Sequence, residues 1–197
     1  MSQKTGQFNI VIVGTGGQGL ITLLQIIAQA AFFAGFDVKT SELHGLSQRG
    51  GSVEVHVRFG KKVFSPLVAQ GEADLVIALE TQEALRAAYF AGKNTTFLIN
   101  EHVIPVPLQT SFTKEQVLKL LSAITHKVEF IPASELCQKT IGTQVVAGIY
   151  LVSSAAFRKI IPLKTELILR AIQKVIPEKY FELNKKTFEL AQHEQRN

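Results

Sequence analysis

The alternation of short apolar runs with longer helical segments predicts an α/β fold. We expect a doubly wound, mostly parallel, Rossmann-like sheet with a β-hairpin insertion. From Gly142 onwards the pattern becomes helical to the end, so the C-terminal part should be helical. The chain has 197 residues and no repeat or proline-rich segment, so residues 1–197 should form a single domain.

The first elements predict a strand, a helix and a second strand. The run "FNIVIVG" from Phe8 ends in glycine, as expected of a central strand buried on both faces. In "GLITLLQIIAQAAFFAG", apolar residues cover most of the circumference and Gly35 follows the last turn, which indicates a buried crossover helix. The segment "FDVKTSE" should form the second strand.

The alternation from Val53 to Phe59 predicts another strand. Apolar and charged side chains alternate with a period of two, which indicates one buried and one wet face. We expect "FGKKVF" to turn this strand into an antiparallel hairpin at an edge of the sheet.

The remaining segments predict further strands and helices. Thr113 and Gln116 form a capping box at the start of a helix, and Pro177 suits the start of another. The predicted strands are "ADLVIALE", "TTFLIN" and "KVEFIP", and the predicted helices include "TQEALRAAYFAG", "TKEQVLKLLSAI" and "PASELCQKTIG".

Charge and composition argue against nucleic-acid and membrane binding. The formal charge is +5, but the basic residues of the C-terminal helices are interspersed with glutamates and the chain has no tryptophan. The most apolar segment, residues 20–36, is interrupted by polar residues and is shorter than the roughly 20 residues of a membrane span. No signal sequence precedes the first strand, so we expect a cytoplasmic protein.

The single cysteine, Cys137, excludes an intramolecular disulfide and an iron–sulfur cluster held by this chain alone, which normally takes about four thiolates. We expect Cys137 to be inert and buried. The five histidines are scattered along the sequence, and no metal-binding spacing is present, so no metal site is predicted.

The glycine-rich turn "GTGGQG" lies directly between the first strand and the helix. It fits Gly-x-Gly-x-x-Gly, and free N–H groups at a helix N-terminus favour an anion. The alternative is that the glycines only allow the strand and the helix to pack closely. NAD is disfavoured because the expected positions 38–41 hold no acidic residue and only Glu42 follows them, and ATP because Leu20 and Ile21 replace the Walker A lysine and hydroxyl residue. The predicted binding residues of this turn are Gly14, Gly16, Gly17, Gln18 and Gly19.

The loop "HGLSQRGGS" is the second candidate binding segment. Two adjacent glycines can present successive N–H groups to an anion, and Arg49 offers a planar fork for phosphate or carboxylate. The alternative is a polar turn before a strand. The predicted binding residues are Ser47, Gln48, Arg49, Gly50, Gly51 and Ser52, and the candidate catalytic residues are His44 and Arg49. Glu80 is expected to be a carboxylate at a helix N-terminus rather than a catalytic group.

The two glycine motifs, in this order, resemble the gamma-type subunit of the 2-oxoacid:ferredoxin oxidoreductases, and in particular the beta subunits of the indolepyruvate oxidoreductases. Leu46 stands where methionine is usual in that family. The resemblance covers nearly the whole chain and includes "IVIVGTGGQG", "SELHGLSQRGGSVEVHVRFG", "SPLVAQGEADLVIALETQEALR" and "IPEKYFELNKKTFELA".

The resemblance implies a complex that oxidatively decarboxylates a 2-oxo acid through thiamine diphosphate, passes electrons through [4Fe-4S] clusters to ferredoxin and forms an acyl-coenzyme A. Neither Asp37 nor Asp74 lies in a Gly-Asp-Gly thiamine motif. A larger partner subunit should therefore hold the thiamine diphosphate and the clusters, and we expect a hetero-oligomer whose isolated small subunit is inactive.

The role of the glycine loops within such a complex stays open. We expect Gly14–Gly19 and Ser47–Ser52 to face a common crevice and to supply anion contacts to coenzyme A or to the active site of the partner. They could instead only dock the larger subunit. The alternatives for the whole chain are a stand-alone Rossmann-type nucleotide-binding oxidoreductase and a non-catalytic assembly module.

Overall fold

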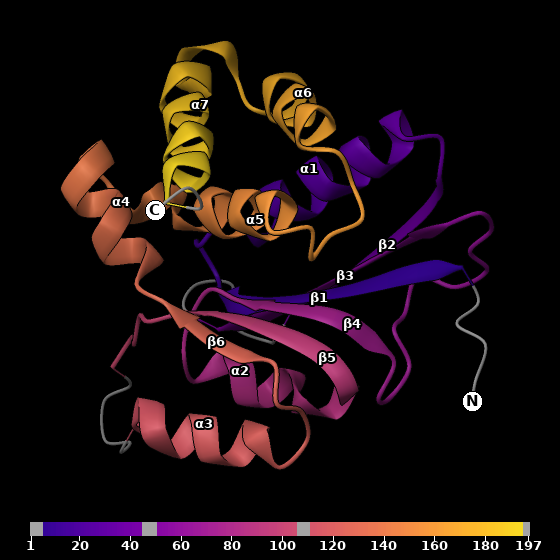
Figure 1. The fold of residues 1–197 in the computed structure, drawn as a ribbon, viewed down its shortest axis with the longest axis vertical. Coiled ribbons are helices and arrows are strands. Elements are labelled where there is room, and N and C mark those ends of the chain that lie inside the picture. The colour runs from indigo at the N-terminus through magenta and orange to yellow at the C-terminus, as the bar shows by residue number, and fades with distance from the viewer. Residues whose placement is uncertain (1–5, 45–50, 106–110, 195–197) are drawn as a thin grey trace.

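Six strands form one mixed sheet in the computed structural model, which describes residues 6–44, 51–105 and 111–194 (Figure 1). The order in the sheet is β2-β3-β1-β4-β5-β6. β1, β4, β5 and β6 pair in parallel, whereas β3 is antiparallel to both β1 and β2, so the predicted mostly parallel sheet is confirmed. The strands are β1 (Gln7–Thr15), β2 (Asp37–His44), β3 (Ser52–Gly60), β4 (Ala73–Ala78), β5 (Ala91–Asn100) and β6 (Val128–Ile131).

Helices cover both faces of this sheet. In Figure 1, α1, α5, α6 and α7 lie on one face and α2 and α3 on the other, which confirms the doubly wound arrangement and the helical C-terminal part. None of the helices in the described ranges is long and apolar enough to cross a membrane. The α-helices are α1 (Leu20–Phe33), α2 (Glu83–Arg86), α3 (Lys114–Ser122), α4 (Ala133–Ile141), α5 (Ala147–Phe157), α6 (Thr165–Val175) and α7 (Glu178–His193), and the 3-10 helices are η1 (Ala87–Phe90) and η2 (Gln144–Val146).

The central strand β1 is buried on both faces, as predicted. Ile10 and Ile12 belong to the hydrophobic cluster that includes α1 and α5, and Val11 and Val13 belong to the cluster on the α2 and α3 side. Successive side chains of a strand point to opposite faces, so the continuous apolar run contributes side chains to both hydrophobic clusters.

Two predicted helix boundaries are confirmed. The Thr113 side chain accepts a hydrogen bond from the Gln116 N–H, and the Gln116 side chain accepts one from the Thr113 N–H, which together form the predicted capping box of α3. Gly35 follows the end of α1 with φ of 81°, a left-handed conformation that glycine adopts without steric cost.

The predicted position of the hairpin is wrong. β3 pairs with β2, the strand before it in the sequence, and lies between β2 and β1, so β2 is the edge strand. Residues 61–72, all of them described, contain no strand; they cover the polar face of β3 instead. His56 accepts a hydrogen bond from the Val68 N–H, and Arg58 donates to the Ser65 and Leu67 carbonyls. Residues 61–72 therefore cover the face of β3 that was predicted to be exposed to solvent.

The fifth strand also begins earlier than predicted. β5 starts at Ala91, within the segment "TQEALRAAYFAG" that was expected to be helical throughout. A Cβ on Gly92 would lie 2.5 Å from the Gly71 carbonyl oxygen, so glycine permits a close backbone approach there. The helical part of this segment ends with η1 at Phe90.

Cys137 is fully buried in α4, which confirms the predicted packing role. Burial raises the pKa of its thiol to about 11. We expect iodoacetamide at pH 8 to label the native chain far more slowly than the unfolded chain, because the thiolate is the nucleophile. Stability should fall as the pH rises from about 9 towards 11, since only the unfolded thiol ionises there. Equal iodoacetamide labelling of the folded and the unfolded chain, measured by mass, would contradict the predicted protection of the thiol.

Candidate functional site

A crevice of about 220 Å³ lies at the carboxyl ends of β1, β4 and β5. After β1 the chain continues to β2, towards one edge of the sheet, and after β4 it continues to β5, towards the other edge. The crevice therefore lies at a topological switch point. Ligands of open α/β sheets bind at such points. The residues that line it at the strand ends are Gly17, Gln18, Leu79, Asn100, His102 and Ile104, and those from the helices are Ser134, Gln144, Val145, Ala147 and Gly148.

Gln18 connects the glycine-rich turn to β4. Its side-chain oxygen accepts a hydrogen bond from the Thr15 N–H at 2.8 Å, and its amide donates to the Leu79 carbonyl at 3.4 Å. A Cβ on Gly14 would lie 2.6 Å from the Gln18 oxygen, so Gly14 serves close packing. Gly17 and Gly19 have φ of 101° and 79°, and a Cβ on either would meet no atom within 4 Å. The backbone at these two glycines therefore borders open space.

Asn100 holds the wall of the crevice together. Its side-chain amide donates to the Leu79 carbonyl at 3.1 Å and to the Ser134 hydroxyl at 2.7 Å, and its oxygen accepts from the Ser134 N–H at 3.0 Å. One buried side chain thus joins the ends of β4 and β5 to the first turn of α4. Sequence reasoning missed this residue.

His102 is the titratable side chain among the residues that line the crevice, and it is half-buried. In the sequence, His102 is one of five scattered histidines, and it was not predicted as a site residue. The signal that could have identified it is its position two residues beyond β5, where the carboxyl ends of parallel strands meet.

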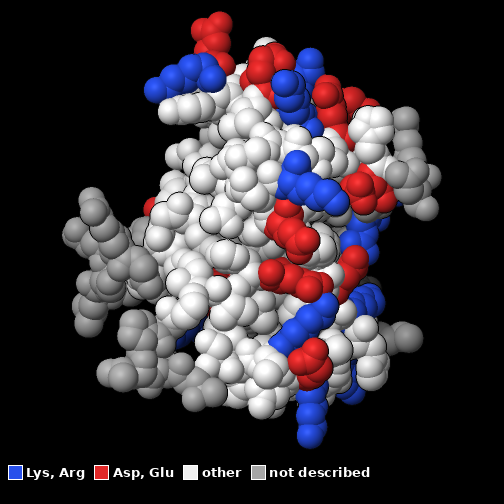
Figure 2. All heavy atoms as spheres, turned by 90° about the vertical axis from the view of Figure 1, so that its left-hand side faces the viewer, with Lys and Arg blue, Asp and Glu red and all other residues white. Residues whose placement is uncertain are grey.

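A larger groove of about 500 Å³ adjoins the crevice, and it shares Gln18, Val145 and Gly148 with it. Val145 is 79% exposed. Figure 2 shows the side on which α4 and the end of β6 lie, where a broad uncharged area is bordered by charged residues at the top and along one margin. No charged side chain is among the residues that line the groove, which include Thr22, Gln25, Ile176, Pro177, Tyr180, Leu183 and Asn184.

The structure brings the two predicted loops together where it describes both. The Gly16 N–H donates to the Gly51 carbonyl at 2.9 Å, and Thr15 pairs with Ser52 in the ladder of β1 and β3. Gly17 and Gln18 line the crevice itself. Ser47, Gln48, Arg49 and Gly50 lie outside the described residues, and His44 is the last residue of β2.

Glu80 has the helix N-terminal role that was predicted. Its carboxylate accepts a hydrogen bond from the Glu83 N–H, the first residue of α2, at 2.9 Å. A second bond comes from the Ile104 N–H at 3.2 Å. Burial raises the pKa of this carboxyl group, while the backbone bonds act in the opposite direction.

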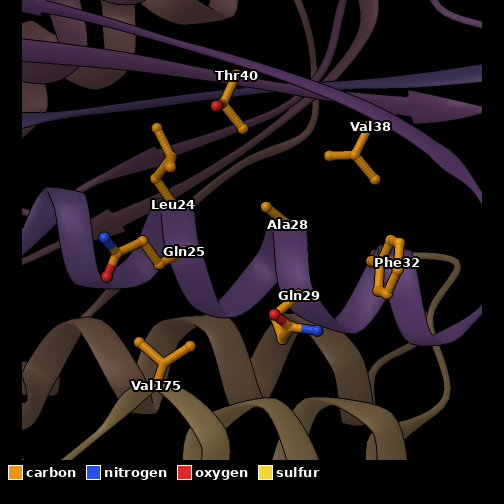
Figure 3. A pocket seen from close by; sticks show the side chains of 8 residues that line it. All are labelled: Leu24, Gln25, Ala28, Gln29, Phe32, Val38, Thr40 and Val175. Carbon is orange, nitrogen blue, oxygen red and sulfur yellow. The ribbon is translucent and has the colours of Figure 1, made fainter.

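Another surface groove, of about 480 Å³, lies away from these loops between α1 and the edge strand β2 (Figure 3). Leu24 and Ala28 rise from α1 towards the strand that carries Val38 and Thr40. None of the predicted site residues lines this groove. Elsewhere in the described part of the chain, no group of three His, Cys, Asp or Glu residues is placed to hold a metal ion.

Comparison with known proteins gives consistent matches over nearly the whole chain. The family model described as pyruvate ferredoxin/flavodoxin oxidoreductase matches residues 9–194. The indolepyruvate oxidoreductase subunit IorB of Archaeoglobus fulgidus is 40% identical over 189 residues, which cover 93% of each chain. The same-named subunit of Thermococcus kodakarensis is 34% identical and covers 93% of this chain and 94% of its own.

Solved structures show the same fold. The gamma subunit of a keto/oxoacid ferredoxin oxidoreductase from Geobacter sulfurreducens has a TM-score of 0.68 at 21% identity and covers 93% of this chain and 95% of its own. A 2-oxoglutarate:ferredoxin oxidoreductase from Magnetococcus marinus has a TM-score of 0.73 at 15% identity. The match covers 96% of this chain but 31% of that one, so the same fold occurs there within a longer polypeptide.

Proposed function

The chain belongs to the pyruvate ferredoxin/flavodoxin oxidoreductase family, and on this premise we propose that it is the small subunit of a 2-oxoacid:ferredoxin oxidoreductase. The complex decarboxylates a 2-oxo acid oxidatively and forms an acyl-coenzyme A. Indolepyruvate is the proposed substrate, because four relatives that are 30–40% identical carry the name indolepyruvate oxidoreductase subunit. This likeness over nearly the full chain is the observation that carries the proposal.

A larger partner subunit supplies the redox chemistry in this proposal. The single thiol of this chain is fully buried in α4, and the chain has no Gly-Asp-Gly thiamine motif. Thiamine diphosphate, iron–sulfur clusters and the contact with ferredoxin therefore belong to the partner, and the isolated small subunit is inactive.

The site on this chain contributes to the binding of coenzyme A. The crevice is the more polar of the two cavities and suits the phosphate end, because Gly17 and Gly19 leave backbone exposed at the start of α1. The uncharged groove has the size of a ligand site and suits the pantetheine arm, which is uncharged and carries amides. Arg49 adds an anion contact from the second loop.

The test is Arg49→Ala in the complex, after the tagged chain has been co-purified anaerobically with its partner. The KM for coenzyme A should rise about tenfold, because a hydrogen bond between two charged groups is lost. The matched control is Arg170→Ala, which removes an arginine stacked on Phe33 away from the crevice. An unchanged KM would refute the coenzyme contact, and failure to assemble would instead identify the loop as a docking element.

A further inference from the structure

The hydroxyl group of Ser52 is engaged inside the chain. It donates a hydrogen bond to a carboxylate oxygen of Glu83 at 2.9 Å. Ser52 is the first residue of β3 and the last residue of the second glycine loop, whereas Glu83 is the first residue of α2, 31 positions further along the chain. A hydroxyl has one proton to donate, so the proton of Ser52 is already in use.

Glu83 is held firmly where it makes this contact. The residue is 7% exposed, and its N–H donates to the Glu80 carboxylate at 2.9 Å. The Arg86 Nε lies 3.3 Å from both Glu83 oxygens, although Oε2 accepts no hydrogen bond. The Arg86 side chain is exposed, whereas Ser52 is half-buried and its bond to Glu83 is partly shielded from solvent. A charge-assisted bond at a buried carboxylate is stronger than an exposed one.

The contact lies beside the junction of the two glycine loops. Gly51 accepts a hydrogen bond from the Gly16 N–H at 2.9 Å, and the next residue, Ser52, donates to Glu83. Two successive residues are therefore fixed, one to the glycine-rich turn and one to α2. The last residues of the second loop cannot shift relative to both the turn and α2 without breaking one of these bonds.

We propose that Glu83 is a positioning residue, and that Ser52 acts through it as an internal anchor rather than by touching a ligand. The Ser52–Glu83 bond fixes the end of the second loop against α2, one residue after the bond of Gly51 to the glycine-rich turn. This inference rests on the proposed role of the two loops in binding coenzyme A. It replaces the prediction that Ser52 itself contacts the cofactor.

A double-mutant cycle in the complete complex tests the inference, with Ser52→Ala, Glu83→Ala and the double variant. Each single change should raise the KM for coenzyme A about tenfold and leave kcat within about twofold at saturating coenzyme. The double variant should be no worse than either single variant, because one bond is lost in all three. Ser52→Thr keeps the hydroxyl and should restore the wild-type KM.

Other outcomes separate this inference from the proposed function. Multiplying effects in the double variant would show that Ser52 and Glu83 act independently and would overturn the anchor. An unchanged KM in both single variants would also overturn it, while a raised KM in Arg49→Ala would leave the coenzyme proposal standing. If Glu83→Ala does not assemble, Ser52→Ala compared with Ser52→Thr decides the question.

The control for a merely structural effect is Glu129→Ala. Glu129 forms an ion pair with Arg158 between β6 and the end of α5, away from the loop junction. This variant should lose stability but keep the wild-type KM. A similar rise in KM here would show that any destabilisation weakens coenzyme binding, which would overturn the positioning role.

Discussion

Replacing Asn100 with alanine should lower the free energy of unfolding by about 3 kcal/mol, because a buried residue with three side-chain hydrogen bonds is lost. The Leu79 carbonyl and the Ser134 N–H belong to buried residues, and each loses a hydrogen-bond partner. For a chain of this size, the melting temperature should fall by about 6–12 °C. Urea unfolding followed by circular dichroism measures the change.

Asn94→Ala is the matched control. Asn94 lies on the same strand β5, but its side chain is exposed, so this change should alter stability by less than about 0.5 kcal/mol. If Asn100→Ala were as mild as Asn94→Ala, the bonds between β4, β5 and α4 would not hold the crevice wall. A large loss at Asn100 alone locates the stabilisation at the carboxyl ends of the strands.

Elements that depend on local pattern were predictable from the sequence. The continuous apolar run of β1 predicts burial on both faces, and the Thr113 and Gln116 pair predicts the start of α3, because in each case the signal lies within a few residues. The place of β3 in the sheet was not predictable. A period of two fixes which side chains share a face, but not which strands become neighbours. The polar face of β3 is covered by residues 61–72, and no local signal shows this.

Of the residues that line the crevice, the sequence predicted only Gly17 and Gln18 of the glycine-rich turn. The order of the two motifs identifies the family. The position of Gly14–Gly19 directly after an apolar run predicts that this turn lies at the carboxyl end of β1. Asn100 and Ser134 are 34 residues apart and meet only because β5 and α4 converge. Likewise, the Ser52–Glu83 bond spans 31 residues, so the sequence favours Ser52 as a ligand contact and gives no sign of its hydrogen bond to Glu83.

The groove and the crevice form one extended site only if a ligand passes Val145, which lines both. This residue projects from the short helix η2 and is 79% exposed, so its side chain adds little to the core. A charge at Val145 should therefore weaken coenzyme A binding and have little effect on the stability of the fold. The proposal for coenzyme A can therefore be tested there without the ambiguity of a destabilised chain.

Val145→Glu should raise the KM of the complex for coenzyme A about hundredfold. The new carboxylate repels the phosphates and places a charge on an otherwise uncharged wall, at a cost of about 3 kcal/mol. The free energy of unfolding should change by less than about 0.5 kcal/mol, because the site is exposed. Steady-state kinetics and urea unfolding measure the two quantities.

Phe64→Glu is the matched control for Val145→Glu, since Phe64 is 80% exposed and follows the end of β3 that pairs with the start of β1, at the opposite end of the sheet. Assembly with the larger subunit is measured first in both variants. A normal KM in an assembled Val145→Glu complex would show that coenzyme A does not pass between crevice and groove. Loss of assembly in this variant alone would instead make the uncharged face a surface for the partner, because a buried unpaired carboxylate opposes docking as strongly as it opposes an anionic ligand.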